Sequence, residues 1–174
     1  EACVDVYTAL SSAGQAYGII DYGSFAMNVM RMEKAFKGAG ELTNEVTLPE
    51  ADVMRFVNSE KSYLGKAETL ANADNLPWIC AYLEIEADGQ NDGHGGEAVL
   101  LDGRVVGTTA SVVYGHTIGK ILAFAYIKPD AATADRGLEV VIAGAARPAR
   151  RLTEAAYDPQ SLRPRSDEKS EAVA

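Results

Sequence analysis

The second half of the sequence is a series of short apolar runs separated by turn residues, and this pattern restricts the chain to few folds. Residues 78–87 alternate between apolar and polar positions, which is the period of a half-buried strand. The apolar positions on one face are Ile79, Ala81, Leu83 and Ile85. Further on, Asp102-Gly103 separates the runs 97–101 and 104–111. Because glycine tolerates the positive φ of a tight turn, this pair predicts a hairpin.

The same pattern of short apolar runs and turn residues continues toward the C-terminus. Residues 119–128 form another strand-like run, and residues 137–143 are expected to pair with 147–152 across the small residues 144–146. About six short strands at a spacing of roughly 8–12 residues are typical of a small antiparallel barrel or sandwich. We therefore predict an all-β unit after Pro77.

The part before Pro77 has a different, mainly helical pattern. Residues 2–10 and 66–73 predict short helices, and residues 24–36 predict a longer one capped by Ser24. Apolar residues at three- and four-residue steps would form the buried face of this longer helix: Phe25, Val29, Met32 and Phe36. A breaker at 11–14 and the glycines at 38 and 40 would end the first two helices.

Composition excludes several classes of function. The 174 residues contain 16 basic and 25 acidic side chains, for a net charge of −9, and 47% hydrophobic residues. This acidity disfavours binding to nucleic acid or to an anionic membrane, since both need clustered cations. No apolar stretch approaches the roughly 20 residues of a membrane helix. Cys3 and Cys80 are too few for a disulfide scaffold, so we expect buried, inert thiols in a reducing compartment.

Three short motifs imitate known sites without completing them. The run from Gly115 to Lys120 is one residue too short for a phosphate-binding loop. The run that begins at Asp88 has Val99 where a calcium loop needs glutamate. A looser metal site from Asp92, His94 and Glu97 is conceivable, but a solvated connection is favoured because three loop ligands without a fourth seldom fix a metal.

Several runs, in order, resemble one known family. Residues 30–43 read MRMEKAFKGAGELT and are followed by TLPEA at 47–51. Downstream are GEAV, DGRVVG, YGHTIGK and YDP, which begin at 96, 102, 114 and 157. Together they resemble the glycine cleavage T-protein superfamily, and especially the branch fused to dimethylglycine and sarcosine dehydrogenases or oxidases. Departures occur at Ala98, where proline is usual, at Leu48, where threonine is commoner, and at Val112-Val113, which replace a glycine-containing turn.

The resemblance implies an α+β fold: residues 1–76 would be the tail of a folate-binding domain, 77–165 a small antiparallel β-barrel of about six strands, and 166–174 a disordered tail. The first residue is Glu1 instead of methionine, so an internal segment of a longer protein is as natural as processing. The family's reactive carboxylate precedes the matched region. No catalytic residue is therefore assigned, and we expect this chain alone to be inactive.

The implied function is that of a fragment of a tetrahydrofolate-dependent one-carbon (aminomethyl or methylene) transferase, the C-terminal part of a dimethylglycine- or sarcosine-oxidising flavoprotein. The alternative is a non-catalytic folate-binding module or a β-barrel interaction module. The cysteine-containing run of the folate-binding relatives that assist iron–sulfur assembly is absent from residues 34–38. FAD is expected only in the parent protein, because no Gly-x-Gly-x-x-Gly run occurs. The expected compartment is the bacterial cytoplasm or the mitochondrial matrix.

The resemblance assigns three residues to tetrahydrofolate, in a site completed by residues upstream. Arg31 would contact the glutamate tail or the pterin, and Tyr114 and His116 would approach the same cleft, with a small amine as the second partner. Glu33 lies on another face of its helix, so we expect a structural role and a pair with Lys37 one turn later. Glu97 at the start of a strand is also expected to be structural, and no metal ligand is assigned.

Overall fold

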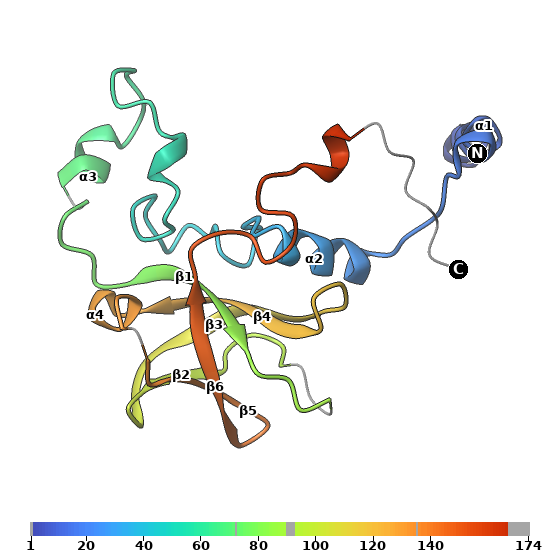
Figure 1. The fold of residues 1–174 in the computed structure, drawn as a ribbon. Coiled ribbons are helices and arrows are strands. Elements are labelled where there is room, and N and C mark those ends of the chain that lie inside the picture. The colour runs from blue at the N-terminus through green and yellow to red at the C-terminus, as the bar shows by residue number, and fades with distance from the viewer. Residues whose placement is uncertain (1, 72, 90–92, 135, 167–174) are drawn as a thin grey trace.

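The structure, a computed structural model, describes residues 2–71, 73–89, 93–134 and 136–166. Its core is a closed antiparallel barrel with the strand order β1-β4-β3-β2-β5-β6, in which β6 pairs back to β1 (Figure 1). The strands are β1 Ile79–Ile85, β2 Ala98–Leu101, β3 Arg104–Gly115, β4 Lys120–Ile127, β5 Leu138–Ile142 and β6 Ala145–Leu152. The predicted six-stranded barrel is confirmed, and its closure leaves no sheet edge unpaired.

Two tight turns set the register of the barrel. Asp102 and Gly103 have φ values of 49° and 77°, so they form the predicted hairpin between β2 and β3. Ala143 and Gly144, with φ of 51° and 82°, connect β5 to β6. The turn therefore precedes the predicted one, and β6 begins at Ala145 instead of residue 147.

Two hydrophobic clusters share the barrel wall, one inside and one outside. The inner cluster contains the predicted alternating residues of β1, with Ala81, Leu83 and Ile85 buried and Ile79 packed against them. The other side of the wall carries a second cluster: Met32, Cys80, Tyr82, Val113, Leu122 and Phe124. Because β1 is covered on both sides, its burial is nearly continuous. In an antiparallel strand with one face in water, buried and exposed residues would alternate instead.

Helix α2 (Ser24–Glu33) lies on the outside of the barrel across β3 and β4 (Figure 1). Its Met32 is fully buried in the outer cluster, and the Tyr82 hydroxyl donates a 2.7 Å hydrogen bond to the Met32 carbonyl. Burial raises the pKa of Tyr82, so this hydroxyl stays protonated as a donor. The helix is thus fixed to the barrel by packing and by a buried hydrogen bond.

Helix α2 differs from its prediction in two respects. It ends at Glu33 instead of residue 36, because Ala35 adopts a left-handed φ of 55° that turns the chain out of the helix. Its N-cap is Gly23 instead of Ser24, without a side-chain cap. On the predicted apolar face, Met32 is buried, whereas Phe25 and Phe36 are 89% and 62% exposed.

The remaining helices are short or stand away from the barrel. They are α1 Ala2–Gly14, α3 Lys66–Ala71, α4 Pro129–Ala132 and the 3-10 turns η1 Gln15–Tyr17, η2 Met54–Phe56 and η3 Arg163–Arg165. Helix α1 continues through the breaker at 11–14 and ends at its last residue, Gly14, instead of at residue 10. Residues 51–57, which the sequence left open between strand and helix, contain the single turn η2. None of the described helices is long and apolar enough to span a membrane.

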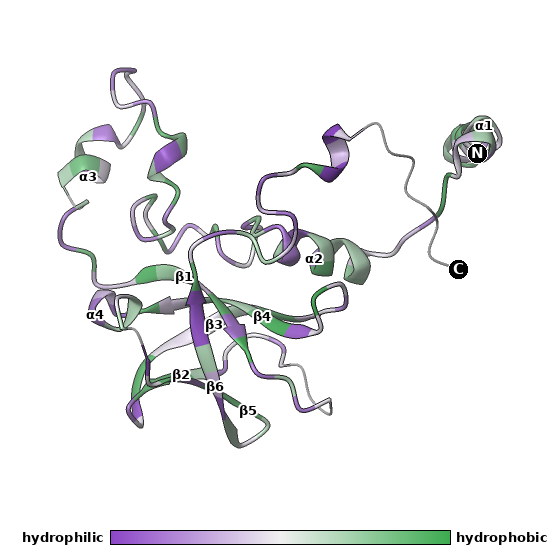
Figure 2. Cartoon of the chain, viewed as in Figure 1, coloured by the Kyte–Doolittle hydropathy of each residue, from purple (hydrophilic) through white to green (hydrophobic). Residues whose placement is uncertain are grey.

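Helix α1 contains no buried residue, although it carries several apolar side chains. Figures 1 and 2 show it apart from the barrel. Both buried clusters of the described residues are built on barrel strands, so residues 2–76 form no separate core of their own. The exposure of Val4, Tyr7 and Leu10 follows from this lack of a packing partner.

Candidate functional site

A pocket of about 360 Å³ lies between α2 and the end of β3. Helix α2 supplies one wall, β3 the opposite wall, and the segment before β2 the rim. The lining residues are Phe25, Asn28, Val29, Gly93, His94, Val112, Val113, Tyr114 and His116. This volume is at the lower end of the range of about 300–1,000 Å³ for pockets that hold drug-sized ligands.

The pocket brings together both histidines of the sequence and Tyr114. Tyr114 is half-buried on β3, and His116 is exposed in the turn that follows it. Their rings meet edge to face with centroids 5.1 Å apart, an arrangement that aromatic pairs prefer. Because the two ring planes are 81° apart, the pair offers ring faces in two directions together with the hydrogen-bonding groups of both side chains.

Arg31 borders the pocket instead of lining it. Its Nε donates to the Asn28 side chain at 2.7 Å, and its Nη2 donates to the Ser111 hydroxyl at 3.1 Å. Its Nη1 donates to Glu41 at 2.9 Å and to the Phe36 carbonyl at 3.1 Å. Asn28 is part of the pocket wall, and Ser111 directly precedes the wall residue Val112. The guanidinium thus connects both walls.

Glu33 and Lys34, at the end of α2, connect this helix to other parts of the fold. The buried carboxylate of Glu33 accepts hydrogen bonds from the amide and the hydroxyl of Thr117, both at 2.8 Å. Lys34 donates to the Ser161 hydroxyl at 3.0 Å, in the segment that follows β6. The structural role predicted for Glu33 agrees with these contacts, but the predicted partner was wrong. Lys37 lies instead 3.5 Å from Asp52.

Glu97 shapes the rim of the pocket. Its carboxylate accepts hydrogen bonds from the amides of His94 at 2.6 Å and Gly95 at 2.9 Å, and from the Thr109 hydroxyl. Burial opposes ionisation, but these hydrogen bonds outweigh it and hold the pKa of Glu97 below its usual value. The carboxylate is committed to its own loop, in agreement with the structural role predicted for it.

Replacing Glu97 with glutamine is expected to lower the free energy of unfolding at pH 7 by about 1 kcal/mol, since hydrogen bonds to a charged acceptor are weakened. A lowered pKa adds stability above the unfolded-state value of about 4.3, and this is lost as the pH falls through the folded-state pKa. The difference between the wild type and the variant should therefore shrink from pH 7 to pH 3 in urea denaturation. A difference that is independent of pH would contradict this account, and Glu86→Gln, at an exposed position, is the control.

Two other residues were considered as ligands of a metal site together with Glu97. Asp92 lies outside the described residues, and His94 lines the pocket. Within the described ranges, no three histidine, cysteine or acidic side chains gather as metal ligands.

The cysteines are placed differently from each other. Cys80 is buried in the outer cluster, as predicted, and burial raises the pKa of its thiol to about 12, which disfavours the reactive thiolate. The prediction was wrong for Cys3, which is exposed on α1 because that helix has no packing partner among the described residues.

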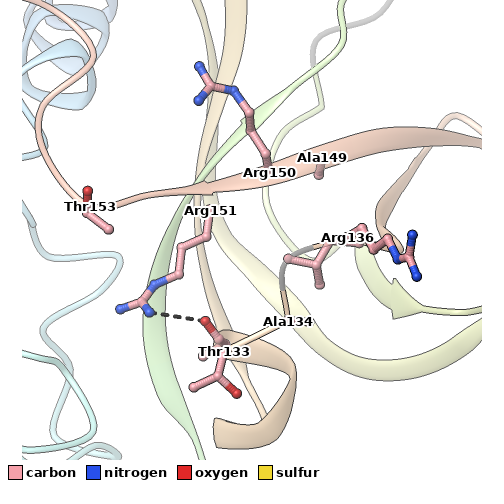
Figure 3. A pocket seen from close by; sticks show the side chains of 9 residues that line it. Thr133, Ala134, Arg136, Ala149, Arg150, Arg151 and Thr153 are labelled. Carbon is pink, nitrogen blue, oxygen red and sulfur yellow. Dashed lines mark hydrogen bonds between the residues drawn. The ribbon is translucent and has the colours of Figure 1, made fainter.

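A second pocket, of about 280 Å³, lies beside β6 and carries three arginines: Arg136, Arg150 and Arg151. Figure 3 shows that their guanidinium groups point away from one another. Arg150 is paired with Glu84 at 2.8 Å, and Arg151 donates to the Ala132 carbonyl at 3.0 Å. Because the charges diverge and two of them are engaged, the three guanidinium groups do not converge on a common anion.

Comparison with known proteins places this barrel in a family. Residues 80–158 match the glycine cleavage T-protein C-terminal barrel domain. The matched residues are fewer than half of the chain, and over them the chain is similar to that barrel domain. The matched barrel domain contains Tyr114 and His116, whereas Arg31 and α2 precede it. The resemblance drawn from the sequence motifs is confirmed.

Two curated relatives and one solved structure extend the comparison. Human mitochondrial dimethylglycine dehydrogenase is 37% identical over 86% of this chain and 18% of its own length. The aminomethyltransferase of Streptomyces coelicolor is 30% identical over 85% of this chain and 41% of its own length. The glycine cleavage system aminomethyltransferase T of Bartonella henselae has the same fold, with a TM-score of 0.65 at 15% identity over 78% of this chain and 38% of that one. The chain therefore spans less than half of each of these proteins.

Sequence reasoning did not identify most of the pocket wall. Phe25 and Val29 have the spacing of a buried helix face and were assigned to the core, although Phe25 is exposed beside the pocket. No sequence pattern marked Asn28 as a site residue, and only its hydrogen bond with Arg31 in the structure indicates a role. The docking of α2 on β3 joins segments about 80 residues apart in the sequence, and local patterns contain no information on such pairs.

Proposed function

We propose that this chain is the C-terminal part of a tetrahydrofolate-dependent one-carbon transferase, within a longer protein that oxidises dimethylglycine, sarcosine or a similar N-methyl amine. The pocket between α2 and β3 carries this proposal, because it unites Tyr114 and His116 and has Arg31 at its border. The names of the two curated relatives support the substrate class, since dimethylglycine and an aminomethyl group both hold one carbon on an amine nitrogen.

The pocket residues fit part of a folate. The Tyr114 and His116 rings suit stacking and edge hydrogen bonds with a flat heterocycle or an aminobenzoyl ring. Arg31 suits a carboxylate, because a guanidinium makes strong charge-assisted hydrogen bonds to it. No aspartate or glutamate is among the described residues of the wall, so the wall supplies binding groups and no general acid or base carboxylate.

Within the longer protein, the role of these residues would be to bind and orient the folate and to exclude water. Tetrahydrofolate, when bound, supplies the nitrogens that accept the one-carbon unit. The wall formed by α2 and β3 would hold the ligand in place, and the rest of the cleft would come from polypeptide upstream of Glu1. Excluding water matters because water hydrolyses a reactive iminium to formaldehyde. A flavin is proposed only for the longer protein, whose compartment would be a mitochondrial matrix or a bacterial cytoplasm.

The test is folate binding by the protein as encoded, including any sequence beyond residues 1–174, measured by isothermal titration calorimetry with tetrahydrofolate. We expect His116→Ala and Tyr114→Ala each to weaken binding about tenfold, through lost stacking and hydrogen bonds of about 1–1.5 kcal/mol. Arg104→Ala is the matched control, because Arg104 is exposed at the opposite end of the same strand. We also expect the 174-residue chain alone to form no methylenetetrahydrofolate from an amine donor.

Each result of this test has a definite meaning. A wild-type protein that does not bind tetrahydrofolate would overturn the proposed function and favour the β-barrel interaction module. Binding that is insensitive to both pocket variants would place the folate elsewhere. Robust turnover by the isolated chain would show that it needs no upstream residues.

A further inference from the structure

Glu41 is a fully buried carboxylate directly behind Arg31. Its Oε2 accepts a hydrogen bond from Arg31 Nη1 at 2.9 Å and from the Gly38 amide at 2.6 Å. Its main-chain carbonyl accepts a 2.6 Å hydrogen bond from the Tyr126 hydroxyl on β4, which anchors the loop to the barrel. A charge is seldom buried completely unless it is paired, and here its partner is the guanidinium.

The loop that carries Glu41 is shaped around that guanidinium. A Cβ atom at Gly38 would lie 3.3 Å from Arg31 Cζ, and one at Gly40 would lie 2.8 Å from the Ser111 hydroxyl oxygen. The two glycines therefore let the loop lie close over Arg31 and its partner on β3. The sequence predicted these glycines only as the end of a helix, but in the fold they form a close-fitting cover for the ion pair.

The contacts leave the arginine with one defined orientation. Nε and Nη1 use all their hydrogens on Asn28, Phe36 and Glu41, and Nη2 gives one hydrogen to Ser111. A guanidinium has five N–H groups, and the described residues accept hydrogen bonds from four of them. The fifth, on Nη2, is left for a ligand. The side chain of Arg31 is 21% exposed, while that of Glu41 is fully buried. Of this pair, only the arginine is accessible from outside the fold.

We propose that Glu41 is the positioning residue for Arg31, holding the guanidinium so that its remaining Nη2 hydrogen meets a carboxylate of the ligand. This inference rests on the proposed folate function. A buried ion pair adds little net stability over an apolar replacement, so orientation explains its presence better than stability does. Preorganised partners behind a binding residue are what fix its geometry.

The experiment compares two ligands on the protein as encoded: tetrahydrofolate, and its α,γ-diamide, in which both glutamate carboxylates are neutral. We expect Glu41→Gln to weaken tetrahydrofolate binding about tenfold and to change diamide binding less than twofold, because one charge-assisted contact is lost. Glu84→Gln is the matched control, since Glu84 also pairs with an arginine, but on the β1–β6 face of the barrel. It should change neither affinity.

The outcomes separate this inference from the proposed function. If the wild type binds neither ligand, the folate function itself fails. If the wild type binds tetrahydrofolate and Glu41→Gln weakens both ligands equally, or neither, Glu41 does not position Arg31. Should Glu41→Gln fail to fold, Gly38→Ala tests the same point without altering any charge. Its added Cβ would lie close against the Arg31 guanidinium and displace it. We then expect the affinity for tetrahydrofolate alone to fall threefold or more. An equal change in the affinities for both ligands, or no change in either, would overturn the inference.

Discussion

Replacing Gly107 with alanine is expected to destabilise the barrel by about 3 kcal/mol or more, the upper part of the range for overpacking. A Cβ atom at this position would lie 2.1 Å from the Tyr126 carbonyl oxygen and 2.7 Å from Ile127 Cα. Both are backbone atoms of β4, paired with β3 at this point. Unlike a flexible side chain, they cannot move aside without breaking the β3–β4 ladder.

Urea denaturation followed by the fluorescence of Trp78, the only tryptophan of the chain, measures this effect. Gly23→Ala is the matched control, because a Cβ atom there meets nothing within 4 Å. As Gly23 is the N-cap of α2, its replacement should cost less than about 1 kcal/mol. Equal stability of the Gly107 variant and the wild type would mean that β3 and β4 are spaced differently from the structure described above.

Replacing Phe124 with alanine is expected to lower the free energy of unfolding by about 3–5 kcal/mol, as for other fully buried aromatic side chains. Phe124 is 1% exposed at the centre of the outer cluster, with its ring centroid 5.1 Å from that of Tyr82. Lys37 Nζ lies over the ring, 5.6 Å from its centroid. Because Met32 of α2 packs in the same cluster, the cavity should also loosen the helix that forms the pocket wall.

Two measurements separate these effects. Urea denaturation reports the loss of global stability, and hydrogen exchange of the α2 amides reports local opening of the helix. Phe56→Ala is the control, because Phe56 is 74% exposed and should change stability by no more than about 0.5 kcal/mol. If α2 amides exchange no faster in the Phe124 variant, packing in the outer cluster does not hold the helix, and its polar contacts through Arg31, Glu33 and Lys34 fix the pocket wall.

The barrel was predictable because its signals are local. Alternation in residues 79–85 and the Asp102-Gly103 turn depend on neighbours within a few positions. The pairs β2–β3, β3–β4 and β5–β6 join consecutive strands, whereas β1–β4, β1–β6 and β2–β5 join strands that are not consecutive and close the barrel. The ends of strands were less predictable. Strand β3 runs four residues beyond its expected end, to Gly115, because its last residues pair with β4 and cover the outer cluster.

Helix α2 illustrates the opposite case. Its period indicated a helix and an apolar face, but not that the barrel would bury only Met32 and leave Phe25 and Phe36 exposed. The pair formed by Glu33 and Thr117 joins residues 84 apart, which no spacing rule anticipates. For the same reason the sequence could not reveal that Glu41 stands behind Arg31.

The sequence by itself determined the strands, the hairpin turn and the family of the barrel, because alternation, turn chemistry and ordered motifs are properties of neighbouring residues. The tertiary structure alone decided which side chains line the pocket and which hold Arg31 in place. The physical reason is that a binding site depends on distances between segments far apart in the chain, and these distances are set only when α2 packs on the outside of a closed barrel.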